Sequence, residues 1–333
     1  MLFVKVPMQK AEPTRKKLLA DGLFDVSHPV QHSKQFVFFP VKARKGGYTF
    51  VERKSVSRPR RPRSLKEALA GKLPADVIEQ LVTSFDTIGD IAIIEVRHGM
   101  DEKMIGQAVL DSNPSIKVVC KKVGGHIGEF RLQPVEVIAG ENRTTTIYKE
   151  HGVQMKVEVD KVYFSPRLSS ERLRIAELVK PGEVIAGFFA GVGPFPLVIA
   201  KKKKCRIYAV ELNPRGYELM QENIKLNRLK GEVIPVLGDV RELAQTLPRC
   251  DRVLMPAPKM GESFLVPCIL AAKPGGIVHY YEFAPEDDLY SAAIARIEKA
   301  AASLGRKVEI INKRVVRAHA VRVSQVAIDF KVL

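Results

Sequence analysis

The pattern of apolar and polar positions becomes regular after residue 165. Short apolar runs such as EVIAGFF, RIYAVEL and GEVIPVLGD alternate with stretches of helical periodicity such as PRGYELMQENIKLNRL. Strands that alternate with helices form a doubly wound, mostly parallel α/β sheet with right-handed crossovers. The two final runs, KVEIINKRVVRA and VRVSQVAIDFKVL, have no helical stretch between them. We therefore predict an antiparallel edge on this sheet.

Two smaller α/β domains are predicted before this sheet. In residues 1–52, the strand-like runs MLFVKVP and QFVFFPV flank the helical stretch PTRKKLLADGL. In residues 64–160, two helical segments, SLKEALAGKLP and PADVIEQLVTSF, precede the strand DIAIIEV, the helix DEKMIGQAVLDSN and a β-rich stretch. The third predicted domain is 161–333.

A basic segment, residues 53–63, separates the first two predicted domains. It contains six Lys/Arg and two prolines and has no apolar periodicity. Such a composition is typical of an exposed linker, and the same charges make it a candidate for phosphate contact. Further candidate phosphate contacts are Lys201–Lys204, Arg314, Arg317 and Arg322.

The charge balance of the chain points to a polyanionic partner. Its 333 residues include 54 Lys+Arg and 37 Asp+Glu, a net charge of +17. A field of this sign attracts nucleic acid, the commonest large polyanion in cytoplasm, although a merely basic surface is the alternative. No apolar run reaches the roughly 18–20 residues that span a bilayer, and the N-terminus lacks the apolar core of a secretory signal. We expect a cytoplasmic protein without membrane contact.

The four cysteines lie far apart and show no metal-ligand spacing. Free, mostly buried thiols are therefore expected, with no metal site.

A glycine-containing loop, FAGVGPF, follows the strand EVIAGFF. Gly191 and Gly193 leave the backbone bare for the close approach of a ligand. The next two strands end in Glu211, suited to the hydroxyls of a ribose, and in Asp239, suited to the amino group of an adenine. The loop fits neither G-x-G-x-x-G nor a P-loop, so the commonest remaining adenosine ligand of such a fold is S-adenosylmethionine. The strand pattern resembles the Rossmann-like class I methyltransferases.

More specific motifs are spread over the whole chain, namely FRLQPVEVIAGENRT, VYFSPRLSSER, FAGVGPF, LNP and GDVRE. Together they resemble the archaeal tRNA (guanine-37-N1)-methyltransferase family. The resemblance implies an enzyme that uses S-adenosylmethionine to methylate N1 of guanosine 37, the nucleotide 3′ of the anticodon. It also implies an N-terminal domain that touches the outer corner of tRNA, an RNA-binding middle domain and a C-terminal catalytic domain.

The resemblance assigns roles to individual residues. Glu171 matches the general base, and Arg131 matches the arginine that stabilises guanine O6. The residues that match cofactor-binding positions are Arg172, Phe189, Gly191, Gly193, Glu211, Leu212, Asp239 and Val240. The residues that match substrate-binding positions are Tyr163, Pro256, Pro258 and Asn142. Guanine N1 carries a proton that a carboxylate must remove as the N–C bond forms, while a guanidinium stabilises the charge developing at O6.

Two positions depart from the family pattern. Gly187 stands where the first strand usually ends in Asp, and Pro256, which lacks an N–H, stands where an Asn is usual. Three alternatives stay open: an aminocarboxypropyl transferase of the same fold, an adenine amino-methyltransferase and a non-catalytic tRNA-binding relative. The Asp/Asn-Pro-Pro-Tyr/Phe motif of the second is missing. Glu171 favours methyl transfer over the first, which needs no base at N1. We expect a monomer with tRNA as its partner.

Overall fold

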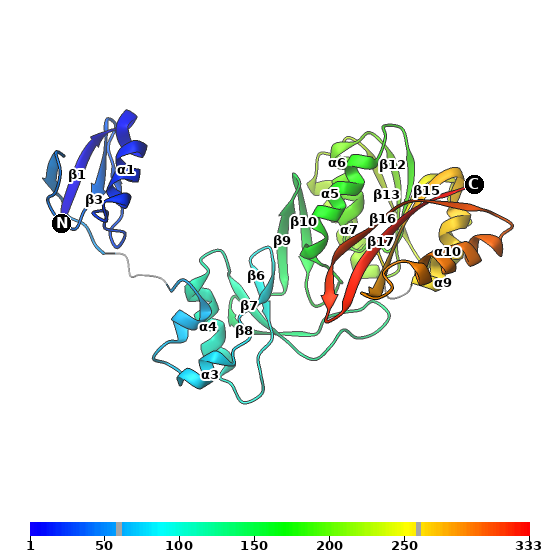
Figure 1. Ribbon diagram of the computed structural model, residues 1–333, viewed down its shortest axis with the longest axis horizontal. Helices are drawn as coiled ribbons and strands as arrows, with labels where there is room; N and C mark the ends of the chain where they lie inside the picture. Colours follow the sequence, from blue (N-terminus) through cyan, green and yellow to red (C-terminus); the bar gives the residue numbers. More distant parts are fainter. Residues whose placement is uncertain (58–61, 258–260) are drawn as a thin grey trace. The chain divides into compact units, whose positions relative to one another are not determined.

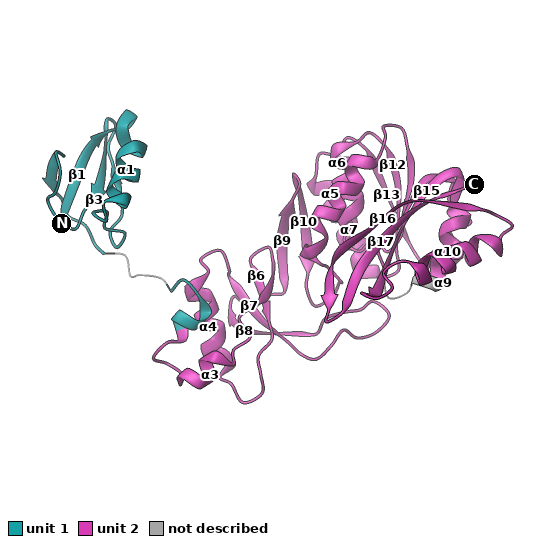
Figure 2. Cartoon of the chain, viewed as in Figure 1, with its two compact units in different colours: residues 1–68 teal, residues 69–333 magenta. Residues whose placement is uncertain are grey.

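The computed structural model describes residues 1–57, 62–257 and 261–333. These residues divide into two compact units, Met1–Ala68 and Leu69–Leu333 (Figure 2). None of the described helices is long and apolar enough to cross a membrane.

The first unit is built on an antiparallel sheet with the strand order β2-β3-β1-β4. Val4 and Val6, on either side of the half-buried Lys5 in β1, pack with Leu18 of α1 in the core of this unit. The elements are β1 (Leu2–Pro7), η1 (Met8–Lys10), α1 (Ala11–Ala20), β2 (Gln31–His32), β3 (Phe36–Pro40) and β4 (Phe50–Glu52).

The second unit begins with a four-stranded sheet of order β5-β6-β7-β8, in which β6 and β7 run parallel. Helix α4 packs on β7 and β8 and buries Ile105 and Val109. The elements are β5 (Phe85–Ile88), β6 (Ile91–Ile94), α4 (Glu102–Ser112), β7 (Val118–Lys122) and β8 (Val135–Gly140).

The two helices predicted between residues 64 and 85 are much shorter than expected. Helix α2 covers only Leu65–Leu69 and α3 only Ala75–Glu79. Phe85, predicted to be helical, begins β5, which pairs antiparallel with β6. Periodicity does not separate a short apolar strand from a buried helical segment, and the pairing with β6 decides the outcome here.

A hairpin of β9 (Thr145–Glu150) and β10 (Val153–Glu158) packs against helices α6 (Pro194–Lys202) and α7 (Pro214–Leu226). Its inward residues Val153 and Met155 belong to a core cluster that also contains residues of β6, β7 and the C-terminal sheet. The hairpin therefore packs in a core shared by the four-stranded sheet β5–β8 and the C-terminal sheet.

A seven-stranded sheet dominates the second unit (Figure 1). Its order is β13-β12-β11-β14-β15-β17-β16; the first five strands are parallel, and β17 is antiparallel to both neighbours. The predicted fold class and antiparallel edge are confirmed. The strands are β11 (Val184–Gly187), β12 (Arg206–Glu211), β13 (Glu232–Leu237), β14 (Cys250–Met255), β15 (Ala272–Pro285), β16 (Val308–Ala320) and β17 (Val323–Val332).

Helices cover both faces of this sheet. Ile185 and Ala186 point to opposite faces of β11, as successive strand residues do, and belong to different core clusters. The first cluster contains residues of α5, α6 and α7, and the second contains residues of α8, α9 and α10. The helices are η2 (Pro166–Leu168), α5 (Ser169–Leu178), α6 (Pro194–Lys202), α7 (Pro214–Leu226), α8 (Val240–Leu243), α9 (Gly261–Ala271) and α10 (Ser291–Ala302).

The edge strand β16 is irregular. Its register against β17 shifts between Ile310 and Asn312, between Val315 and Arg317, and between Ala318 and Ala320. Extra residues of this kind twist a strand and interrupt its ladder of hydrogen bonds.

Candidate active site

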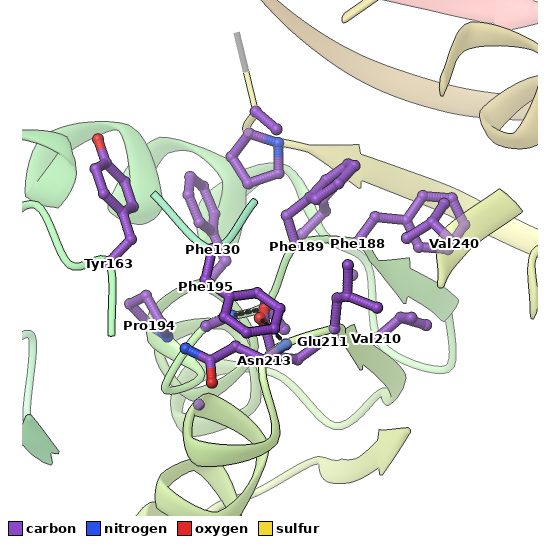
Figure 3. A pocket seen from close by; sticks show the side chains of 18 of the residues that line it. Phe130, Tyr163, Phe188, Phe189, Pro194, Phe195, Val210, Glu211, Asn213 and Val240 are labelled. Atoms are coloured by element: carbon purple, nitrogen blue, oxygen red, sulfur yellow. Dashed lines mark hydrogen bonds between the residues drawn. The ribbon is translucent and has the colours of Figure 1, made fainter. Parts of the chain in front are cut away.

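A cavity opens at the carboxyl ends of the parallel strands, which we call the strand-end cavity (Figure 3). Strand β11 lies between β12 and β14, so the strand order reverses there, and ligands of doubly wound sheets bind at such a point. The predicted site residues that line it are Arg131, Tyr163, Arg172, Phe189, Gly191, Glu211, Leu212, Asp239, Val240 and Pro256.

Glu211 is fixed at the end of β12 by backbone donors. Its carboxylate accepts hydrogen bonds from the N–H of Gly191 (2.6 Å) and the N–H of Asn213 (2.8 Å). Burial raises the pKa of the Glu211 carboxyl, and these backbone donors oppose the rise. A carboxylate has about four lone-pair sites, so further acceptor capacity remains for a ligand hydroxyl.

The loop after β11 takes a left-handed backbone at three alternate positions. Phe189 has φ 53°, Gly191 has φ 55° and Gly193 has φ 90°. A non-glycine residue pays for this conformation, and such residues concentrate at functional sites. The Phe189 ring packs edge-on against Phe264, with ring centroids 4.8 Å apart. The result is an apolar wall, completed by Val240, beside the Glu211 carboxylate.

Asp239 begins the short helix α8. Its carboxylate accepts from the N–H of Arg241 (2.7 Å) and from the Arg241 guanidinium. The hydrogen bond to the Arg241 side chain lowers the pKa of Asp239, against a smaller effect of burial. The predicted helix VRELAQTL is limited to Val240–Leu243, which leaves this capped turn at the rim of the cavity.

Arg172 is buried and committed to another carboxylate. Its guanidinium donates to both oxygens of Glu150, at 2.5 Å and 2.8 Å, and to the carbonyl of Ser165 at 3.2 Å. Glu150 ends β9, so this ion pair ties the hairpin to α5. The Arg172 side chain reaches the cavity wall in a fixed position.

Glu171 lies on the first turn of α5 but is not among the residues that line the strand-end cavity. It is buried, with 1% of its surface exposed. Its Oε1 accepts from Arg174 (2.7 Å) and from the Tyr281 hydroxyl (2.7 Å), and its Oε2 lies 3.7 Å from Arg314. Burial and the Glu171 charge raise the pKa of Tyr281 well above its ordinary value.

A chain of buried polar groups continues from Glu171 through the sheet. Arg174 also donates to Asp329 (2.7 Å), Asp329 pairs with Nδ1 of His279 (2.6 Å), and Nε2 of His279 faces the guanidinium of Arg252 (2.6 Å). Burial lowers the pKa of His279, because Asp329 only partly offsets it. A neutral ring that donates from Nδ1 and accepts at Nε2 satisfies both neighbours.

Tyr163 and Phe130 line the strand-end cavity (Figure 3), and Arg131 is a third lining residue. The Arg131 guanidinium lies over the Tyr163 ring, 4.8 Å from its centroid. Arg131 itself has φ 53°, a second left-handed non-glycine residue at the cavity. Both residues come from loops, Arg131 from the middle sheet and Tyr163 from the segment before α5.

Two other predicted residues, Gly193 and Asn142, lie elsewhere. Gly193 (φ 90°) is the N-cap of α6 and does not line the cavity. Asn142 is exposed in the turn between β8 and β9. Pro258 lies outside the described residues. Gly187 does line the cavity, and a Cβ built there meets Pro196 and Ile207 at ordinary contact distances of 3.5 Å and 3.6 Å.

Sequence reasoning missed several lining residues, including Phe188, Phe195 and Asn213. The dipeptide Asn213-Pro214 carried a readable signal, because Asn at a helix N-cap followed by Pro is a common helix start. Arg174 was detectable as the residue three positions after Glu171, on the same helix face.

The described residues contain no cluster of three or more His, Cys, Asp or Glu side chains arranged to hold a metal ion. All four cysteines are free and buried, as predicted. Burial raises the pKa of the Cys120 and Cys205 thiols to about 11.

Comparison with known proteins places this geometry in a family. Residues 146–311 match the TRM5/TYW2 methyltransferase domain, residues 65–144 the TYW2 N-terminal domain, and residues 4–49 the tRNA methyltransferase 5 N-terminal domain. The tRNA (guanine(37)-N(1))-methyltransferase Trm5b of Pyrococcus abyssi is 40% identical over 333 residues, covering 99% of each chain. The chain belongs to the TRM5/TYW2 methyltransferase family.

Two further relatives are a solved Trm5 structure and an aminocarboxypropyltransferase. The crystal structure of Methanocaldococcus jannaschii Trm5 in complex with adenosine superposes with a TM-score of 0.68 at 32% identity, covering 100% of this chain and 99% of that one. The tRNA(Phe) (4-demethylwyosine(37)-C(7)) aminocarboxypropyltransferase of Pyrococcus horikoshii is 30% identical over 271 residues, which are 80% of this chain and 96% of the relative. The predicted family and fold are confirmed.

Proposed function

We propose that the protein transfers the methyl group of S-adenosylmethionine to N1 of guanosine 37 in tRNA. The observation that carries the proposal is the strand-end cavity, where the Glu211 carboxylate and a bare loop stand opposite Arg131 and Tyr163. The full-length similarity to a tRNA (guanine(37)-N(1))-methyltransferase supports the same activity.

The lining of the cavity fits an adenosine-containing cofactor. We assign Glu211 to the ribose hydroxyls, the Phe189 and Val240 wall to the adenine faces, and Asp239 to the adenine amino group. The same proposal includes the other matched cofactor positions, Arg172, Gly191, Gly193 and Leu212; of these, Gly193 acts by starting α6. When bound, S-adenosylmethionine supplies an electrophilic methyl group, and no metal is needed for its transfer.

We assign the removal of the guanine N1 proton to Glu171 and the stabilisation of charge at O6 to Arg131. Hydrogen bonds from Arg174 and Tyr281 fix the position of the Glu171 carboxylate. Because Glu171 does not line the cavity, we infer that a bound guanine replaces part of this hydrogen bonding. Tyr163 and Pro256 are the proposed neighbours of the base on the cavity wall; Asn142 and Pro258 stay predictions from the family pattern.

The partner proposed for this site is tRNA, held at its anticodon loop and outer corner. The net charge of +17 favours a long, salt-sensitive contact with phosphates. The domain boundaries at 52, 63 and 160, the monomeric state and the cytoplasmic location remain predictions. Size-exclusion chromatography with light scattering tests the monomer.

Transfer of a radiolabelled methyl group to a tRNA transcript tests the proposed function. We expect label on a transcript with G37 and none on the G37→A transcript. Glu171→Gln is expected to lower the rate by about 10²- to 10⁴-fold, the usual size of a general-base effect. Glu177→Gln, which changes an exposed carboxylate of the same helix, serves as the control. Absence of label with the wild-type protein would contradict the proposal.

Aminocarboxypropyl transfer is the second candidate, favoured by the similarity to the Pyrococcus horikoshii relative and by the missing Asn at Pro256. The mass of the modified nucleoside separates the two reactions. With cofactor labelled in the methyl group alone, only methyl transfer labels the tRNA.

A further inference from the structure

A second cavity, which we call the polar cavity, adjoins the strand-end cavity and shares Arg131 and Tyr163 with it. Its other side is formed by strands β15 and β16 and carries Phe283, Arg317 and His319. Apart from Arg131 and Tyr163, none of its lining residues is assigned above to the cofactor or the target base.

The register of the antiparallel edge places these groups in one row. Gln325 of β17 pairs with Phe283 of β15 on one side and with Arg317 of β16 on the other. Residues directly opposite each other in antiparallel strands share a face of the sheet. Nε of Arg317 donates to Oε1 of Gln325 at 2.9 Å, which holds the guanidinium in place.

The charge of the polar cavity is positive. Asp86 is paired with Arg167 at 2.7 Å, so its charge is already compensated. Within the described residues, no carboxylate forms an ion pair with Arg131 or Arg317. Burial lowers the pKa of Arg317, and a half-buried guanidinium without a carboxylate is suited to a phosphate.

Aromatic rings stand on both sides of the same cavity. The rings of Phe283 and His319 are stacked, with centroids 3.8 Å apart and planes at 21°. Across the cavity, His126 packs against Tyr163 at 5.7 Å. Aromatic faces beside cations are the means by which proteins hold single-stranded nucleic acid, since every base has a face that stacks.

We propose that the polar cavity binds a nucleotide adjacent to the target in the RNA strand. Its base extends the Phe283–His319 stack and its phosphate meets Arg317. This inference rests on the proposed function for the identity of the target. Occupation of this cavity keeps the strand open on one side of the target base and directs that base toward Arg131 and Tyr163.

Binding of wild-type and variant protein to intact and abasic anticodon stem-loops tests the proposal without any chemical step. Affinity is measured by fluorescence anisotropy for an intact loop and for loops with an abasic nucleotide at position 36 or at position 38. We expect one abasic loop to bind the wild-type protein about 5- to 150-fold more weakly, the usual effect of losing one stacked base. Phe283→Ala should weaken the intact loop similarly and remove the effect of that abasic site.

Two further variants separate stacking and charge from folding. Phe283→Leu keeps apolar volume without an aromatic face and should behave as Phe283→Ala does. Arg317→Gln should reduce the slope of log affinity against log salt by about one phosphate contact. Arg249→Gln, an exposed arginine before the first residue of β14 and thus at the opposite ends of the strands, should leave that slope unchanged.

The proposal is overturned if Phe283→Ala and each abasic site lower the affinity for the loop additively. It is also overturned if the wild-type protein binds both abasic loops as tightly as the intact loop, or does not bind the loop at all. Methyl transfer measured on the same RNA reports on the proposed function separately. If methyl label is transferred but Phe283→Ala leaves the effect of the abasic site unchanged, only the proposed nucleotide site is wrong. If Phe283→Ala removes the effect of the abasic site but no label is transferred, only the proposed reaction is wrong.

Discussion

Two carboxylates of the second unit, the half-buried Glu211 and the buried Glu171, are held in opposite ways. At the end of β12, Glu211 is met by backbone N–H groups, and burial raises its pKa. Where α5 meets β15 and β17, Glu171 is met by Arg174 and Tyr281, with Arg314 nearby. Backbone N–H groups orient the first carboxylate toward the cavity, whereas the side chains of Arg174 and Tyr281 hold the second between α5 and the antiparallel edge. The hydrogen-bond partners of each carboxylate, more than its burial, therefore distinguish the two proposed roles.

Substitution of Asp329, which holds Arg174 beside Glu171, has the largest expected effect on stability. Asp329→Ala leaves Arg174 and His279 without their shared acceptor in the core. Removing one member of a buried ion pair typically costs about 3–5 kcal/mol of the free energy of unfolding. Urea unfolding measures the loss, with the exposed Asp287→Ala as the control. Equal stability of the two variants would show that the buried chain does not support α5.

Glu211→Gln tests the other carboxylate. An amide cannot accept from both backbone N–H groups and a ligand hydroxyl with the strength of a carboxylate. We expect the affinity for S-adenosylmethionine to fall by about 10- to 150-fold, as for loss of a charged hydrogen bond worth about 1.5–3 kcal/mol. Calorimetric titration should show no such loss for Glu171→Gln. Equal losses in both variants would remove the distinction between the two carboxylates.

The pH dependence of stability tests His279, which pairs with Asp329 in the buried chain that leads to Glu171. His279 has a pKa below its ordinary value of 6.5, so the unfolded chain binds its proton first as pH falls. The free energy of unfolding should therefore decrease below about pH 6.5, by at most about 1.4 kcal/mol per pH unit from this group. Denaturation curves of His279→Gln should show a smaller slope there, and those of the exposed His98→Gln an unchanged one. An unchanged slope in His279→Gln would contradict this prediction.

The smallest expected effect is a gain at Gly187. The space beside it admits a Cβ at ordinary contact distances, so Gly187→Asp adds an acceptor to the cavity without a steric clash at the Cβ position. One additional hydrogen bond, worth about 0.5–1.5 kcal/mol, should tighten S-adenosylmethionine by about 2- to 10-fold. Gly47→Asp, at an open position of the first unit, is the matched control. Weaker binding by Gly187→Asp would mean that its charge opposes Glu211.

The doubly wound sheet, its antiparallel edge and much of the strand-end cavity were predictable because their signals are local. The bare loop at Gly191 and the acidic residues Glu211 and Asp239 each lie at the end of their own apolar run. The lengths of α2, α3 and α8 were not predictable from periodicity; only for the stretch after α3 does the structure show a cause, the pairing of β5 with β6.

The surroundings of Glu171 could not be predicted from local sequence. Asp329 is 155 residues from Arg174, and Tyr281 is 110 residues from Glu171. Only the packing of α5 on the antiparallel edge brings these side chains together. The polar cavity has the same origin, since its row of Phe283, Gln325 and Arg317 follows from strand register.

The irregular strand β16 has a consequence for colloidal behaviour. A thirteen-residue strand at the border of a sheet offers unpaired backbone groups onto which another chain can add, the first step of aggregation. Its three register shifts and the exposed side chains Lys313 and Arg314 oppose such addition. The strand that carries Arg317 of the polar cavity thus has features that disfavour the addition of another chain along the sheet.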